Sequence, residues 1–127
     1  MENKQILIVD DEPDVTSYLR SYFQQHQFEV LTASSGEAGL SLLLLKKPAI
    51  VLLDMKLGDG LSGMEVLRRG LAAKTGAQII VVTAVDDKNV ATLAMGLGAT
   101  DYLTKPFMLD ELEQIVLNRL KERGENR

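Results

Sequence analysis

Short apolar segments alternate along this chain with longer segments in which apolar residues recur every three or four positions. The short segments are rich in isoleucine, valine and leucine, which is typical of buried strands in a parallel sheet, and the longer ones have the period of amphipathic helices. Strands are therefore predicted at residues 6–9, 28–32, 50–53, 79–82 and 100–104, each followed by a helix. This alternation predicts an α/β fold with a doubly wound parallel sheet.

Capping and helix-breaking residues set the expected helix bounds. Pro13 suits the first turn of a helix, and the capping-box patterns at residues 34–37 and 62–65 are expected to open the second and third helices. The fifth helix is expected over residues 109–123. The first helix is expected to end near residue 26 and the second near Lys47. The fourth helix is expected to begin at Asp86 or Asp87 and to end at Gly98, and Gly124 is expected to end the fifth.

Polar side chains follow four of the predicted strands where each strand ends. Asp10 and Asp11 follow the first strand and Asp54 follows the third, while Thr83 and Lys105 end the fourth and fifth. Because the carboxyl ends of parallel strands share one edge of a sheet, we expect these side chains to converge into a site for a cation and a phosphoryl group. Each alone has a more ordinary interpretation, as a helix-terminal acid, a turn residue or a solvated loop cation. Their joint occurrence favours the site.

Bulk composition excludes several other classes of protein. The chain has 127 residues, 46% of them hydrophobic, which suits one globular domain. A net charge of -4 gives no basic surface for nucleic acid, and the absence of cysteine excludes disulfides and thiolate metal sites. The leucine run at residues 42–45 is far too short to span a membrane, and residues 1–5 lack a signal-peptide core. A cytoplasmic location is expected.

The strand-end motifs are similar to those of response-regulator receiver domains. The strings that carry the resemblance are ILIVDDE at residues 6–12, IVLLDM at 50–55, VVTA at 81–84 and GATDYLTKPF at 98–107. The resemblance covers essentially the whole chain and implies a flavodoxin-like fold of five helices with strand order 2-1-3-4-5. We expect a receiver domain over residues 1–124, with 125–127 as a polar tail or the start of a linker.

The resemblance also implies a chemistry for these residues. Asp54 would accept a phosphoryl group from the phosphohistidine of a sensor histidine kinase or a histidine phosphotransfer protein. Asp11, Asp54 and the backbone carbonyl of Lys56 would bind Mg²⁺ directly, with Asp10 acting through water. Lys105 would pair with Asp54 at rest and with phosphoryl oxygens afterwards, and its peptide bond to Pro106 is often cis in the family.

Thr83 and Tyr102 would convert phosphorylation into a signal. The Thr83 hydroxyl would bind a phosphoryl oxygen, and the Tyr102 ring would then turn inward. This would change the surface formed by the fourth helix, the fifth strand and the fifth helix, which would contact an output domain or protein. The loop after Asp54 departs from the family pattern, because Gly58 stands where proline is usual and the following Ser-Gly pair arrives one residue late. Val85 is apolar where a polar residue could orient water, which suggests slow loss of the phosphoryl group.

Two other functions stay open from the sequence. A receiver-like interaction module that does not use phosphate is the main alternative, although the complete set of strand-end residues argues against it. A phosphatase with an aspartyl-phosphate intermediate would be expected to have an acid two residues after Asp54, and this chain has Lys56 there. We therefore expect a stoichiometric phosphoacceptor and not an enzyme.

Overall fold

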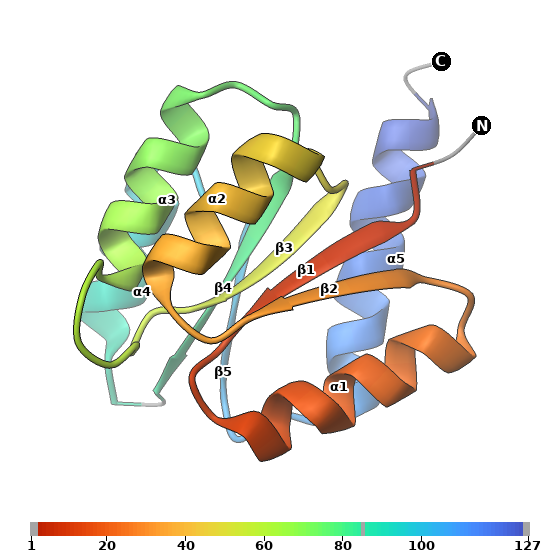
Figure 1. Cartoon of the computed structure of the whole chain (residues 1–127), viewed down its shortest axis with the longest axis horizontal. Coiled ribbons are helices and arrows are strands. Elements are labelled where there is room, and N and C mark those ends of the chain that lie inside the picture. The colour runs from red at the N-terminus through yellow and green to blue at the C-terminus, as the bar shows by residue number, and fades with distance from the viewer. Residues whose placement is uncertain (1–2, 85, 126–127) are drawn as a thin grey trace.

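The computed structural model describes residues 3–84 and 86–125, the last three of these by their backbone alone. Five strands alternate with five helices in these ranges (Figure 1). The strands are β1 (Gln5–Val9), β2 (Glu29–Ala33), β3 (Ile50–Asp54), β4 (Gln78–Ala84) and β5 (Asp101–Lys105). The helices are α1 (Pro13–Gln25), α2 (Gly36–Lys46), α3 (Gly63–Ala72), α4 (Lys88–Leu97) and α5 (Leu109–Glu125).

The five strands form one parallel sheet in the order β2-β1-β3-β4-β5, as predicted. Side chains alternate between the two faces of each strand, so neighbouring residues enter different cores. Ile6 and Ile8 pack on the face covered by α1 and α5, whereas Leu7 and Val9 pack on the face covered by α2, α3 and α4 (Figure 1). Both faces of the three central strands β1, β3 and β4 are therefore buried, which explains why these strands are apolar at nearly every position.

The N-terminus of α2 differs from the predicted capping box. Ser35, and not Ser34, is the N-cap, and its hydroxyl oxygen accepts a hydrogen bond from the backbone N–H of Ala38 at 3.1 Å. The helix starts one residue later than expected, so Glu37 is not in the position from which it could bond back to the cap. Its carboxylate instead contacts the loop after β3.

The other helix ends agree more closely with the sequence. Ser62 caps α3 by accepting the N–H of Glu65, as predicted, while the Glu65 carboxylate pairs with arginines of its own helix. Asp87 is the N-cap residue of α4 but its side chain makes no capping hydrogen bond. The expectation that Gly124 ends α5 is wrong, because the helix continues to Glu125. Val85 lies outside the described residues.

No helix in the described ranges is both long enough and apolar enough to cross a membrane.

Candidate functional site

Parallel pairing aligns the predicted site residues at one edge of the sheet. Asp54 ends β3 opposite Val82 of β4, and one residue further on Thr83 lies opposite Thr104 of β5. Asp10 follows β1, where its backbone N–H donates to the carbonyl of Ala33 at 3.0 Å. Lys105 is the last residue of β5. The sheet therefore brings residues from four separate parts of the chain to one place.

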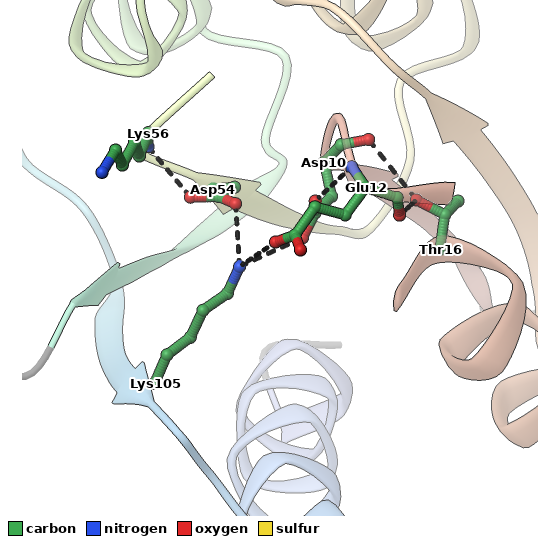
Figure 2. A network of polar contacts seen from close by, with 6 residues as sticks. All are labelled: Asp10, Glu12, Thr16, Asp54, Lys56 and Lys105. Atoms are coloured by element: carbon green, nitrogen blue, oxygen red, sulfur yellow. Dashed lines mark hydrogen bonds and ion pairs between the residues drawn. The ribbon is translucent and has the colours of Figure 1, made fainter. Parts of the chain in front are cut away.

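Lys105 is the centre of a polar network (Figure 2). Its Nζ lies 2.9 Å from Oδ2 of Asp54, 3.5 Å from Oδ2 of Asp10 and 3.4 Å from Oε1 of Glu12. Asp10 and Asp54 are only 5% and 6% exposed, so the lysine is the cation that offsets two buried carboxylates. The Lys105–Pro106 peptide bond is cis, as the resemblance implied.

The network raises the pKa of two of its members, Asp10 and Lys105. Burial raises the pKa of Asp10 above its ordinary value, and the nearby charge of Asp54 adds to this effect, although the backbone N–H of Glu12 and Lys105 oppose it. Burial by itself lowers the pKa of Lys105, but its hydrogen bond to Asp54 and the surrounding carboxylate charges outweigh burial and raise that pKa. Lys105 thus holds its proton more tightly than a free lysine would, and Asp10 ionises less readily than a free aspartic acid.

Backbone amides orient the two buried carboxylates. The N–H of Glu12 donates to Oδ1 of Asp10 at 2.9 Å, and the N–H of Lys56 donates to Oδ1 of Asp54 at 2.9 Å. Each bond joins a side chain to the backbone two residues further on, a local arrangement that Asp favours at strand ends. Since Oδ1 of Asp54 is held in this way, its Oδ2 faces Lys105.

The carboxylates that lie together are not the full set expected for metal binding. Oxygens of Asp10, Glu12 and Asp54 lie within 4.8 Å of one another in the described part of the chain, close enough to share a cation. Asp11 is outside this group and exposed, and its Oδ2 is 3.4 Å from where a Cβ on Gly58 would be. Glu12 was not predicted as a site residue. Its position two residues after Asp10, directly before Pro13, was the available signal.

Thr83 and Tyr102 lie on the side of the sheet that faces α4. Thr83 is buried, and its Oγ1 has no hydrogen-bond partner among the described residues. A buried hydroxyl without a partner is costly, so this atom has unused capacity to bind a polar group. Tyr102 is 45% exposed. Both residues line one groove of about 630 Å³ between β4, β5 and α4, which leaves space beside the Tyr102 ring.

Comparison with known proteins identifies this arrangement. A family model described as the response regulator receiver domain matches residues 6–117. The chain belongs to this family. Its acidic pocket of Asp10, Glu12 and Asp54 fits the phosphoacceptor site of such domains. Receiver domains are regulatory phosphoacceptors of two-component systems and not classical enzymes.

Individual relatives agree with this assignment. The chain is 32% identical to sporulation initiation phosphotransferase F of Bacillus subtilis over 91% of its own length and 93% of that protein. It is also 38% identical to the alkaline phosphatase synthesis transcriptional regulatory protein PhoP of the same species, over 83% of this chain and 43% of PhoP. The chain thus spans less than half the length of this regulator, and it spans 46% of the transcriptional regulatory protein KdpE of Mycobacterium tuberculosis.

Solved receiver structures have the same fold. A CheY-like response regulator receiver domain protein from Methanospirillum hungatei superposes with a TM-score of 0.91 at 26% identity, over 98% of both chains. A response regulator receiver domain protein from Clostridium thermocellum gives a TM-score of 0.89 at 31% identity, over 97% of this chain and 98% of the other. The flavodoxin-like architecture with strand order 2-1-3-4-5 is that of a receiver domain.

Proposed function

We propose that this receiver domain accepts a phosphoryl group on Asp54 from the phosphohistidine of a sensor kinase or a histidine phosphotransfer protein. The observation that carries the proposal is the environment of Asp54, a buried carboxylate at a strand end with one oxygen held by an amide and the other by Lys105. A carboxylate oxygen of Asp54 would attack phosphorus while the phosphorus–nitrogen bond to the histidine breaks. The nitrogen leaves with the electron pair of that bond.

The donor set of the site fits Mg²⁺. Carboxylate oxygens of Asp10, Glu12 and Asp54 lie within 4.8 Å of one another, and these three groups carry more negative charge than Lys105 alone offsets. Asp11, Asp54 and the backbone carbonyl of Lys56 would bind the ion, with Asp10 acting through water. When bound, Mg²⁺ would supply positive charge that reduces repulsion between the carboxylates and an incoming phosphoryl group.

Lys105 has two roles in this proposal. Before transfer it orients the Asp54 carboxylate through the bond of 2.9 Å. After transfer the Asp54 oxygen carries the phosphoryl group, and the ammonium group of Lys105 is close enough to bond the new phosphoryl oxygens instead. The lysine would therefore stabilise negative charge before and after transfer without a large movement of its side chain.

The signal would pass through Thr83 and Tyr102. The Thr83 hydroxyl, which has no hydrogen-bond partner in the described part of the chain, can donate to a phosphoryl oxygen, and the exposed Tyr102 ring can then occupy the neighbouring groove. This change would reshape the face formed by α4, β5 and α5 toward an output domain or protein. A shift from 1:99 to 99:1 between the two states needs about 5.5 kcal/mol, a size that a few charge-assisted hydrogen bonds can reach.

The domain would act stoichiometrically, with one phosphoryl group per chain. We place the receiver in residues 1–124, with a tail or linker from about residue 125, and expect it to work in the cytoplasm. The output would be a domain or protein that responds to the changed α4–β5–α5 face. We also expect slow spontaneous loss of the phosphoryl group, and a lifetime of a few seconds would contradict that expectation.

Intact mass measured after incubation with acetyl phosphate tests the central step. We expect one phosphoryl adduct on the wild type in the presence of Mg²⁺, and none on Asp54→Asn or after addition of EDTA. The Asn variant keeps the shape and the Oδ1 acceptor of Asp54 but lacks the nucleophile. If the wild type gives no adduct and does not bind beryllofluoride, the proposal fails and a phosphate-independent interaction module takes its place.

The Thr83→Ala variant separates acceptance of phosphate from signalling. It should form the same adduct as the wild type, because Thr83 does not contact Asp54 among the hydrogen bonds of the resting site. It should fail to move the Tyr102 ring, which NMR of the Tyr102 side chain with and without beryllofluoride measures. The same ring displacement in Thr83→Ala as in the wild type would exclude the coupling.

A further inference from the structure

The loop between β3 and α3 is attached to the beginning of α2. The carboxylate Oε2 of Glu37, in the first turn of α2, accepts a hydrogen bond from the backbone N–H of Leu61 at 2.8 Å. The two residues are 24 positions apart in the chain. Since the acceptor is a carboxylate oxygen and the donor is a backbone amide of the loop, this bond joins the helix to the loop and does not cap the helix itself.

Two glycines allow the loop and the helix to approach this closely. Gly60 has φ +99°, a backbone conformation that residues with a side chain rarely adopt, and a Cβ there would be 2.6 Å from Oε2 of Glu37. A Cβ on Gly36 would overlap the backbone carbonyl of Leu61. The contact therefore depends on several residues of both segments, which indicates a built junction and not a chance surface bond.

The other end of the same loop reaches the phosphoacceptor. The backbone N–H of Lys56 bonds Oδ1 of Asp54, and Gly58 faces the carboxylate of Asp11. Leu57 and Leu61 pack against the core on the α2–α3 face. The loop is thus held at Asp54 on one side and at Glu37 on the other, with the backbone carbonyl of Lys56 between these two attachments.

We propose that Glu37 is a positioning residue for the phosphoacceptor site, acting through the loop that carries Lys56 and Gly58. This inference rests on the proposed function. When the bond to Leu61 is present, the loop is ordered before a cation binds, so binding does not have to supply the ordering free energy. When the bond is absent, the loop samples other conformations. The apparent affinity for the cation then falls in proportion to the fraction of chains that hold the binding-competent loop conformation.

Glu37→Ala tests this role with a readout that does not require phosphorylation. Mg²⁺ is titrated into the chain without a phosphodonor, and binding is followed by NMR shifts of the amides of residues 55–61. Because the bond is solvent-exposed, we expect the half-saturating Mg²⁺ concentration to rise by about twofold to fivefold. The amide of Leu61 should lose its protection from hydrogen exchange. Adduct formation from acetyl phosphate should return to the wild-type rate at saturating Mg²⁺.

Two further variants separate positioning from a general effect on α2. Ser35→Ala removes the N-cap bond to Ala38 at the same helix end and leaves the Leu61 bond in place, so it should bind Mg²⁺ like the wild type. Glu37→Gln keeps an acceptor oxygen and should recover part of the lost affinity. The inference is overturned if Glu37→Ala binds Mg²⁺ as the wild type does, if Ser35→Ala weakens binding equally, or if Glu37→Gln recovers nothing. These outcomes leave the proposed function intact. The proposed function fails only if the wild type forms no adduct and does not bind beryllofluoride.

Discussion

Replacing Lys105 by methionine removes the cation of the site while keeping a side chain of similar length. The substitution leaves Asp54 and Asp10 buried without their counterion, since Nζ of Lys105 lies 2.9 and 3.5 Å from their Oδ2 atoms. Breaking a buried pair from one side is more costly than removing both partners, because one charge stays uncompensated. We therefore expect the variant to be less stable than the wild type at neutral pH.

The size of the loss follows from these distances. With an effective dielectric constant of about 20, a charge pair at 2.9 Å is worth roughly 6 kcal/mol before any cost is subtracted. The desolvation of the partly buried lysine is recovered on its removal, and the site lies at an open edge of the sheet where water can enter. We expect a net loss of about 2–3 kcal/mol in the free energy of unfolding.

Urea unfolding at pH 7 without divalent cations measures this loss, and two changes of condition test its cause. Burial raises the pKa of Asp10, so its contribution to stability is present at low pH and is lost as pH rises through the folded-state pKa. Lysine removal strengthens this effect, and the deficit should shrink as pH falls toward 5. Mg²⁺ should shrink it as well, because an ion that binds only the folded state stabilises it.

Lys56→Met is the matched control. Figure 2 shows the Lys56 side chain pointing away from Asp54. The hydrogen bond between the two residues is made by the backbone N–H of Lys56. This variant should change stability by less than about 0.5 kcal/mol. If Lys105→Met is as stable as Lys56→Met at pH 7, or if its deficit does not depend on pH, the reasoning about uncompensated buried carboxylates is wrong.

Two further predictions concern packing and alkaline stability. Gly39→Ala should destabilise the fold by about 1–2 kcal/mol in urea unfolding, because its Cβ would lie 2.8 Å from both methyl carbons of Val9. In contrast, Gly96→Ala should stabilise α4 by up to about 1 kcal/mol, since nothing lies within 4 Å of the new methyl group; equal effects would contradict the packing argument. The hydrogen bond from Tyr22 to Glu113 raises the pKa of Tyr22 to about 12. The stability that wild type has over Tyr22→Phe should therefore be full below pH 10 and disappear by about pH 12, and a difference independent of pH would show that this bond is not its source.

Much of the fold and the centre of the site can be predicted from the sequence. Apolar runs without polar interruption identify strands buried on both faces, and parallel strands place their carboxyl ends on one edge. For that reason Asp10, Asp54, Thr83 and Lys105 were expected to converge, and the structure brings them together. Each of them lies at the end of a strand or directly beside it, so the ends of the strands determine their positions.

The tertiary structure decided how residues just beyond the strands are used. Glu12 joins Lys105 and the buried carboxylates while Asp11 turns toward Gly58, a difference that depends on how the chain enters α1. Likewise Glu37 was expected to cap its own helix, and instead it holds the amide of Leu61. Local sequence patterns describe bonds within one element. A carboxylate near the end of a helix can bond a donor from a neighbouring element. Its partner is therefore determined only when the elements pack together.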